Sequence, residues 1–281
     1  MQDVKGLVGV FTGAGEGMGR AMVLNLARAG MNIAVLDINE EAARTTATDC
    51  IEVGVNAVGI RCDVTLLSDL DAAASRIKAA LGAVNLLWVH AGVGLGGEEG
   101  FLGAKRNSIR WMYAVNVDGV IDTVRTFVPA MKQQSGWRHV GITGSMAGLV
   151  QCLPGGPVTY AASKYATVGI GESLRVELEP FGIGVTLFCP GSTSTRMWDG
   201  ARARPDRYGG PQPLPEEYGR RLREIGMNAD EVAAYAIGAA RLGQFYAIMP
   251  ETAERAKRVE ERFRNMEQAI YLPKAMRNRS V

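Results

Sequence analysis

The sequence predicts an α/β fold, a doubly wound parallel sheet of about seven strands with helices on both faces. Three observations predict it. Short apolar runs of strand length alternate with amphipathic segments of about ten or more residues, which is the pattern of βαβ units. A glycine-rich turn directly follows the first apolar run. Polar residues or glycines follow the later runs, at the edge of a parallel sheet where ligands bind.

The composition is that of an ordinary globular protein. Of the 281 residues, 47% are apolar and 21% are charged, and the net charge of +2 gives no reason to expect a nucleic-acid partner. No apolar run reaches membrane-spanning length, so we expect no membrane contact. We expect a cytoplasmic protein because the cysteines are scattered, as reduced thiols usually are. Two histidines and no clustered Cys, Asp or Glu predict that there is no metal site.

The first unit of the predicted sheet contains the glycine turn. Residues 7–12 form a strand-length run, and residues 20–29 have helical apolar spacing that stops at Gly30. Between them lies the turn Gly13-Ala14-Gly15-Glu16-Gly17-Met18-Gly19. Its glycines let the backbone approach a pyrophosphate, and the helix N-terminus offers free N–H groups. This turn therefore predicts a dinucleotide-binding site.

The second predicted strand, residues 32–36, ends at Asp37, which lies 18 residues after Gly19. A carboxylate at this place can accept both hydroxyls of an adenosine ribose, and it repels a 2′-phosphate. Glu16 adds a second negative charge, and Ile38 follows where a cation would favour NADP. These features favour NAD. The alternative for Asp37 is an N-cap of a helix over residues 40–53.

The remaining elements continue the alternation. Further strands are predicted at residues 57–62, 86–89, 140–143, 184–189 and 245–249. Further helices are predicted at residues 66–81, 107–115, 117–133 and 158–179. The strand ends are followed by candidate site residues, namely Asp63, Gly92, Ser145 and Pro190.

The helix predicted over residues 158–179 carries Tyr160 and Lys164, whose spacing of four places them on one face. An ammonium beside a phenol lowers the phenol's pKa from its ordinary value of about 10. Such a tyrosine can take a proton from an alcohol or give one to a ketone. Alone, the pair also fits an amphipathic helix with a tyrosine at its edge, and the other motifs decide between the two.

Two segments follow the nucleotide-binding pattern. Residues 193–215 are rich in Gly, Pro and Arg but contain Met197 and Trp198, which predicts a lid, not a plain linker. We expect one dinucleotide-binding and catalytic domain over residues 1–250, with this substrate lid at about 193–225. Residues 251–281 are expected to form a C-terminal helical extension, because residues 251–268 show the spacing of an amphipathic surface helix.

Together these residues resemble the classical short-chain dehydrogenase/reductase family over about residues 5–250. The motifs, in order, are Thr12-Gly13-x-x-x-Gly17-x-Gly19, Asp63, Ala91-Gly92, Asn116, Ser145, Tyr160-x-x-x-Lys164 and Pro190-Gly191-x-x-x-Thr195. The resemblance implies a Rossmann-type fold and an NAD(H)-dependent oxidoreductase acting on CH–OH groups. It implies a homodimer or a homotetramer, with a small molecule as substrate.

The resemblance also assigns roles to single residues. The catalytic set would be Asn116, Ser145, Tyr160 and Lys164: Tyr160 is the acid/base, Ser145 binds the substrate oxygen, Lys164 also binds the nicotinamide ribose, and Asn116 holds a relay water. Asp63 would contact adenine. The residues expected to bind NAD are Gly13, Gly15, Glu16, Gly17, Met18, Gly19, Asp37, Ile38, Asp63, Val64, Ala91, Gly92, Tyr160, Lys164, Pro190, Gly191, Thr193 and Thr195.

Both histidines are expected to have structural or surface roles. His90 stands where the family commonly has an asparagine, and its ring can make similar hydrogen bonds, so we favour a structural substitute over a catalytic base. His139 precedes a predicted strand and is expected at the surface.

The candidate substrate pocket is mostly apolar and favours a hydrophobic or aromatic secondary alcohol or ketone. Its expected residues are Val93, Leu95, Ser145, Leu149, Leu153, Met197 and Trp198. The lid arginines Arg196, Arg202, Arg204 and Arg207 could bind an acidic group, but solvated charges are the commoner case. Three alternatives remain: an NADPH-dependent ketone or 3-oxoacyl reductase, a non-catalytic dinucleotide-binding protein, and a sugar epimerase or dehydratase.

Overall fold

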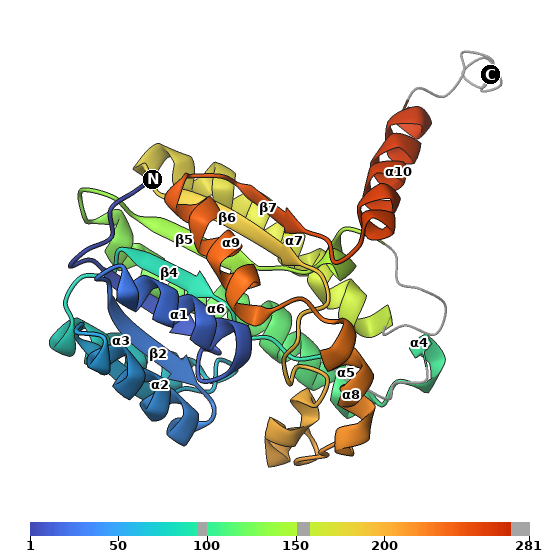
Figure 1. Cartoon of the computed structure of the whole chain (residues 1–281), viewed down its shortest axis with the longest axis horizontal. Coiled ribbons are helices and arrows are strands. Elements are labelled where there is room, and N and C mark those ends of the chain that lie inside the picture. Colours follow the sequence, from blue (N-terminus) through green and yellow to red (C-terminus); the bar gives the residue numbers. More distant parts are fainter. Residues whose placement is uncertain (95–99, 151–157, 271–281) are drawn as a thin grey trace.

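The computed structural model describes residues 1–94, 100–150 and 158–270. Among these residues it forms one parallel seven-stranded sheet in the order β3-β2-β1-β4-β5-β6-β7 (Figure 1). The strands are β1 (Val8–Thr12), β2 (Asn32–Asp37), β3 (Ala57–Arg61), β4 (Leu86–Val89), β5 (His139–Thr143), β6 (Gly184–Pro190) and β7 (Tyr246–Met249). Each predicted strand lies within one residue of these bounds. The doubly wound, Rossmann-type fold is confirmed.

Helices cover both faces of the sheet, as Figure 1 shows for α1 and α9 in front of it and α6 and α7 behind. One face packs against α1 (Gly17–Arg28), α2 (Glu40–Glu52) and α9 (Ala229–Arg241). The other packs against α3 (Leu67–Ala80), α6 (Gly119–Lys132) and α7 (Val158–Leu178). Because side chains alternate along a strand, Val10 enters one apolar layer and its neighbour Phe11 the other. This double burial explains the continuous apolar runs of the strands.

The helix α9 was not predicted, although its sequence carries the signals of a helix. The side chain of Asn228 accepts hydrogen bonds from the N–H groups of Asp230 (2.8 Å) and Glu231 (3.2 Å), which caps the first turn. Val232 and Ala236 then face the sheet from one side of the helix. The alanine-rich sequence is helical here because this apolar side is covered by the rest of the domain.

Most of the remaining elements follow the carboxyl ends of the strands, and η3 instead precedes β6. They are α4 (Gly100–Gly103), α5 (Arg106–Tyr113), the π-helical turn η1 (Ala114–Asp118), η2 (Met146–Gly148), η3 (Glu179–Phe181), η4 (Gly200–Ala203), η5 (Asp206–Tyr208), α8 (Glu216–Ile225) and α10 (Ala253–Ile270). The turn η1 joins α5 directly to α6. The helix α10 points away from the body of the domain in Figure 1. Within the described residues, none of the helices is long and apolar enough to cross a membrane.

The prediction that His139 lies at the surface is wrong, because the residue is 1% exposed. It is the first residue of β5, a central strand that is covered on both faces. Its Nε2 lies 2.8 Å from the Thr186 hydroxyl, and its ring stacks on Trp137. Gly184 leaves the room, since a Cβ there would lie 2.4 Å from the imidazole Nδ1. Burial lowers the pKa of His139 to about 4, so the ring is neutral.

Candidate active site

A cavity of about 1070 Å³ lies at the carboxyl ends of the strands. It exceeds the usual volume of a single small-molecule pocket, roughly 300–1,000 Å³, so it has room for a dinucleotide and a substrate together. Residues predicted to bind NAD line it, all except Gly15 and Gly19. Of the four predicted catalytic residues, Ser145, Tyr160 and Lys164 line the cavity. Asn116 does not line it and is buried.

The glycine turn after β1 brings backbone against the cavity in a way that other residues would prevent. Gly13 has φ +66°, and a Cβ there would lie 2.7 Å from the Ala91 Cα. A Cβ on Gly19 would lie 2.4 Å from the Gly13 carbonyl oxygen. Glu16, the N-cap residue of α1, makes no side-chain cap. The first N–H groups of α1 therefore remain available to a phosphate.

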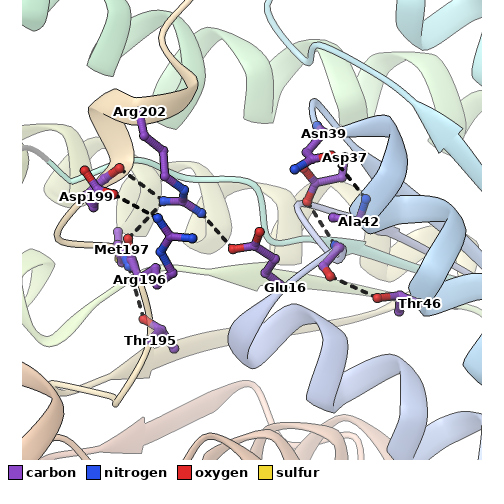
Figure 2. Close-up of polar contacts among 11 residues, drawn as sticks. Glu16, Asp37, Asn39, Ala42, Thr46, Thr195, Arg196, Met197, Asp199 and Arg202 are labelled. Atoms are coloured by element: carbon purple, nitrogen blue, oxygen red, sulfur yellow. Dashed lines mark hydrogen bonds and ion pairs between the residues drawn. The ribbon is translucent and has the colours of Figure 1, made fainter. Parts of the chain in front are cut away.

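Asp37 is held at the end of β2 with both carboxylate oxygens ordered by backbone (Figure 2). Its Oδ2 accepts from the Gly15 N–H at 2.9 Å and its Oδ1 from the Asn39 N–H at 2.9 Å. Asn39, not Asp37, caps α2, because its Oδ1 accepts from the Ala42 N–H at 3.1 Å. Asp37 is therefore not the N-cap of α2. Burial raises the pKa of Asp37 above its usual value, although the two backbone hydrogen bonds oppose this.

Two arginines of the lid segment, residues 193–225, reach back to acids of the nucleotide site. Arg202 Nη2 lies 2.8 Å from Glu16 Oε2 (Figure 2). Arg207 donates to the Asp63 carboxylate and to the Thr65 hydroxyl. Burial alone would raise the pKa of Asp63, but the bonds from Arg207 and Thr65 bring it below its usual value. The lid is therefore tied to the glycine turn and to the end of β3.

The other two lid arginines also have partners in the protein. Arg196 forms an ion pair with Asp199 at 3.1 Å. Arg204 is buried and donates to the Ser108 hydroxyl at 3.0 Å and to the Gly210 carbonyl at 2.8 Å. The expectation of solvated lid charges is wrong for Arg204, because its guanidinium is used to hold the lid together.

Lys164 and Tyr160 both lie in the first turns of α7 and face the cavity. Lys164 is buried, its Nζ donates to the Thr143 carbonyl at 3.0 Å, and it lies 5.9 Å from the centre of the Tyr160 ring. Burial lowers the pKa of Lys164 to about 8, which still leaves it mostly charged at neutral pH. The Tyr160 hydroxyl lies 4.0 Å from the sulfur of Met197 in the lid segment, so the phenol points toward the predicted substrate side.

Ser145 follows β5 and caps a short helix, while its predicted contact with the substrate oxygen stays a prediction. Its Oγ accepts from the Ala147 N–H at 3.0 Å and so caps the short helix η2. That bond uses a lone pair of the hydroxyl and leaves its hydrogen free to donate. Because Ser145 lines the cavity, this hydrogen is available to a substrate oxygen.

Asn116 lies in the π-helical turn η1 and is fully buried. Its amide makes a two-way bond with the backbone of Val93: Oδ1 accepts at 2.8 Å and Nδ2 donates at 2.9 Å. Nδ2 also donates to the Ser163 hydroxyl at 3.0 Å, next to Lys164 in α7. The wider π turn brings this side chain between β4 and α7, and such turns are common at functional sites. The relay water predicted for Asn116 stays a prediction.

His90 braces the end of β4 against its neighbours. Its backbone N–H donates to the Thr12 hydroxyl at 3.0 Å, and its ring Nδ1 lies 3.0 Å from the Thr143 hydroxyl. Burial, and then the charge of Lys164, lower the pKa of His90 to about 4. These bonds across three strands agree with a structural substitute.

The predicted substrate pocket is assembled in part. Val93, Ser145, Met197 and Trp198 line the cavity, whereas Leu149 packs into the hydrophobic core. Leu95 and Leu153 lie outside the described residues.

Two charged residues that the sequence reading missed, Glu251 and Arg255, also line the cavity. Their position after β7, at the same edge as the other strand ends, is the signal that could have found them.

Comparison with known proteins places the chain in a family. The family model of the short chain dehydrogenases matches residues 8–206. The chain belongs to this family. Its sequence is 30% identical over 210 residues to the C alpha-dehydrogenase of Sphingobium sp., covering 74% of this chain and 68% of that protein. It is 32% identical over 206 residues to the cyclohexanol dehydrogenase of Rhodococcus sp., covering 68% of this chain and 76% of that protein.

A solved structure supports the same membership. The short-chain dehydrogenase/reductase from Burkholderia phymatum, crystallised in complex with NAD, matches with a TM-score of 0.86 and 31% sequence identity, covering 96% of this chain and 97% of that chain. The protein is therefore an oxidoreductase of the short-chain dehydrogenase family, which uses a nicotinamide dinucleotide.

Proposed function

We propose that the protein is an NAD-dependent oxidoreductase that interconverts a secondary alcohol and a ketone, with a hydrophobic or aromatic substrate. The observation that carries this proposal is that Ser145, Tyr160 and Lys164 line one cavity with Asp37 and the glycine turn. The hydroxyl of Ser145, the phenol of Tyr160 and the ammonium of Lys164 thus face the same cavity as the nucleotide-binding residues. The names of the relatives, a cyclohexanol dehydrogenase among them, agree with an alcohol as substrate.

The residues of the nucleotide site fit a bound dinucleotide. The cradle that a Cβ on Gly13 would fill, together with the free N–H groups of α1, suits a pyrophosphate. The carboxylate of Asp37 suits the ribose hydroxyls. When bound, NAD⁺ would supply the hydride acceptor for the carbinol carbon.

The chain's own side chains would do the proton chemistry. Tyr160 takes the proton of the substrate hydroxyl as the carbon–hydrogen bond breaks. Ser145 donates its free hydrogen to the substrate oxygen and stabilises the charge that develops there. The Lys164 ammonium, fixed by the Thr143 carbonyl at 3.0 Å, favours the phenolate of Tyr160. Met197 and Trp198 of the lid close the apolar side of the pocket.

A second candidate, an NADPH-dependent ketone or 3-oxoacyl reductase, is favoured by one observation. Arg202 reaches Glu16 from the lid, and its charge acts on Asp37 in the direction opposite to that of Glu16. The guanidinium of Arg202 could bind a 2′-phosphate. Asp37 and Glu16 together still favour NAD, because two carboxylates face one guanidinium. Calorimetric titration of the protein with NAD⁺ and with NADP⁺ separates the two candidates. Tighter binding of NADP⁺ would favour the NADPH-dependent reductase over the NAD-dependent enzyme.

We also propose a homo-oligomer. Ile121 of α6 and Val176 of α7 are 38% and 70% exposed, so both long helices carry apolar side chains that a second copy could cover. Light scattering of the full chain distinguishes a monomer, a dimer and a tetramer.

The central test of the function is Tyr160→Phe, which removes only the phenolic hydroxyl. We expect NADH formation from cyclohexanol and other secondary alcohols to fall by roughly 10²–10⁴-fold, the usual contribution of an acid/base, while NAD⁺ still binds. Tyr165→Phe is the matched control, because Tyr165 lies in the same helix and packs under Arg262. If Tyr160→Phe kept turnover near that of the control, the acid/base assignment would be wrong.

A further inference from the structure

The cavity has a polar corner formed by Glu251 and Arg255, which no motif of the sequence assigns. Glu251 follows the end of β7, and Arg255 lies in the first turn of α10. The two side chains are 15% and 20% exposed, and Arg255 Nη1 lies 3.7 Å from Glu251 Oε1. The Thr252 hydroxyl accepts from the Arg255 N–H at 3.1 Å and fixes this turn. The ion pair is therefore mostly buried, and it lies on a helix start that is capped by Thr252.

One atom of each partner is buried without a hydrogen bond. Glu251 Oε2 and Arg255 Nε have no partner among the described residues. The other carboxylate oxygen, Oε1, receives the Ser192 hydroxyl at 3.5 Å as well as Arg255. A buried polar atom left unsatisfied costs about 1–3 kcal/mol, so native proteins seldom keep one without a reason. Both atoms are closed off from the cavity, so the pair is incompletely bonded inside the protein, and a ligand in the cavity would meet the parts of the two side chains that stay accessible there.

The corner lies beside the turn that follows β6. The Glu251 carboxylate packs directly on Gly191, where a Cβ would lie 2.0 Å from Oε2. Gly191 is one of the residues expected to bind NAD, and Met197 and Trp198 of the lid segment line the same cavity, while Asp37 and the glycine turn lie at the ends of β1 and β2, on the other side of the sheet centre. The corner thus lies at the end of the cavity remote from Asp37, where the proposed function brings the cofactor and the substrate together.

The opposite charges of Glu251 and Arg255 limit which kind of ligand group can bind at the corner. An anionic group would meet the Glu251 carboxylate, and a cationic group would meet the Arg255 guanidinium. A neutral hydroxyl suits both, because it donates to an oxygen and accepts from an N–H at the same time. The neighbouring hydroxyl of Ser192 is already directed at Glu251 Oε1.

We propose that Glu251 and Arg255 recognise a second hydroxyl group of the substrate, so that the substrate is a diol or a phenol-bearing alcohol on an apolar ring skeleton. The proposal rests on the proposed function, because it assigns the second polar group of the same substrate. Ser145 and Tyr160 bind the oxygen that reacts. The corner binds the oxygen that does not, and so decides which ring position is presented for oxidation.

The test compares substrates that differ only in this hydroxyl. NAD⁺-linked kcat/KM is measured for cyclohexanol against each isomeric cyclohexanediol, and for phenylethanol against each hydroxyphenylethanol. We expect at least one hydroxylated partner to be preferred roughly tenfold or more, as a hydrogen bond to a charged group provides. Glu251→Gln and Arg255→Met should each lower that ratio by about tenfold. Glu261→Gln and Arg264→Met, both on exposed parts of α10, are the matched controls and should leave the ratio unchanged.

A binding measurement separates this proposal from the proposed function. Calorimetry on the Tyr160→Phe protein loaded with NAD⁺ measures the affinity for the same substrate pairs without turnover. If the preference for the hydroxylated partner appears there and falls with Glu251→Gln, the corner is a hydroxyl site even where no alcohol is oxidised. Equal affinity for every pair would overturn the proposal. A rise in the KM for NAD⁺ that is the same for all substrates would also overturn it, because the corner would then serve the cofactor.

Discussion

The buried histidine at the start of β5 makes the stability of the protein depend on pH in a way that can be calculated. His139 has a pKa of about 4 in the folded chain, against an ordinary value of 6.5. A group whose pKa is depressed by folding stabilises the protein above the unfolded value and loses this contribution as the pH falls. The window for His139 is therefore from about pH 6.5 down to about pH 4.

The magnitude follows from the two pKa values of His139. At pH 7 neither state binds much proton, whereas at pH 5 the unfolded histidine is almost fully protonated and the folded one is not. The free energy of unfolding therefore falls by about 2 kcal/mol between pH 7 and pH 5. The value changes little if the folded pKa differs by one unit, because pH 5 lies well below 6.5. His90, whose pKa is also lowered to about 4, changes the free energy of unfolding with pH in the same direction.

Urea unfolding of the wild type and of His139→Gln at pH 7 and pH 5 tests this reasoning. We expect His139→Gln to be less stable at pH 7, because the Thr186 contact is disturbed, but to lose about 2 kcal/mol less than the wild type on going to pH 5. The carboxylates titrate alike in both proteins, so the difference isolates the histidine. An equal loss in both proteins would show that His139 is not a buried neutral ring, and the reasoning would be refuted.

Two further substitutions test the nucleotide site and the lid. In Gly15→Ala the added Cβ would lie 3.0 Å from the Asp37 carboxylate, so we expect NAD⁺ to bind roughly tenfold more weakly by calorimetry. Gly169→Ala, where a Cβ meets nothing within 4 Å, is the control, and an equal effect of the two would contradict the prediction. Arg207→Gln removes the ion pair to Asp63, and limited proteolysis should cut the lid segment up to about fivefold faster, since such a pair contributes up to about 1 kcal/mol. An unchanged cleavage rate would show that this pair does not hold the lid.

The sequence predicted the sheet because the signals for strands and turns are local. Each strand is a short apolar run whose neighbours on both faces are helices, and its end is marked by a glycine or a polar residue. The same locality places Asp37 and Ser145, because parallel strands bring their carboxyl ends to one edge, and the spacing of four residues places Tyr160 and Lys164 on one face of α7. Residue type and order alone therefore indicated the dinucleotide site and the acid/base pair.

Tertiary structure decided which charged and polar groups meet. Arg202 and Glu16 are 186 residues apart, and Arg207 and Asp63 are 144 apart. The path of the lid creates these pairs, and no periodic pattern encodes that path. His139 is buried for a similar reason, since Thr186 and Gly184 of β6, which follows it along the chain, pack against its ring.

The polar corner formed by Glu251 and Arg255 shows most clearly what the sequence does not predict. The sequence places Glu251 and Arg255 four residues apart near the start of a charged helix, where a solvated pair is the ordinary expectation. Only the fold shows that β7 ends beside the turn after β6 and that both side chains line the cavity. The sequence by itself thus determined the reaction class that we propose, because strand ends and motif residues are encoded locally. The packing of distant segments decided the surroundings of the substrate, because burial depends on what covers a side chain.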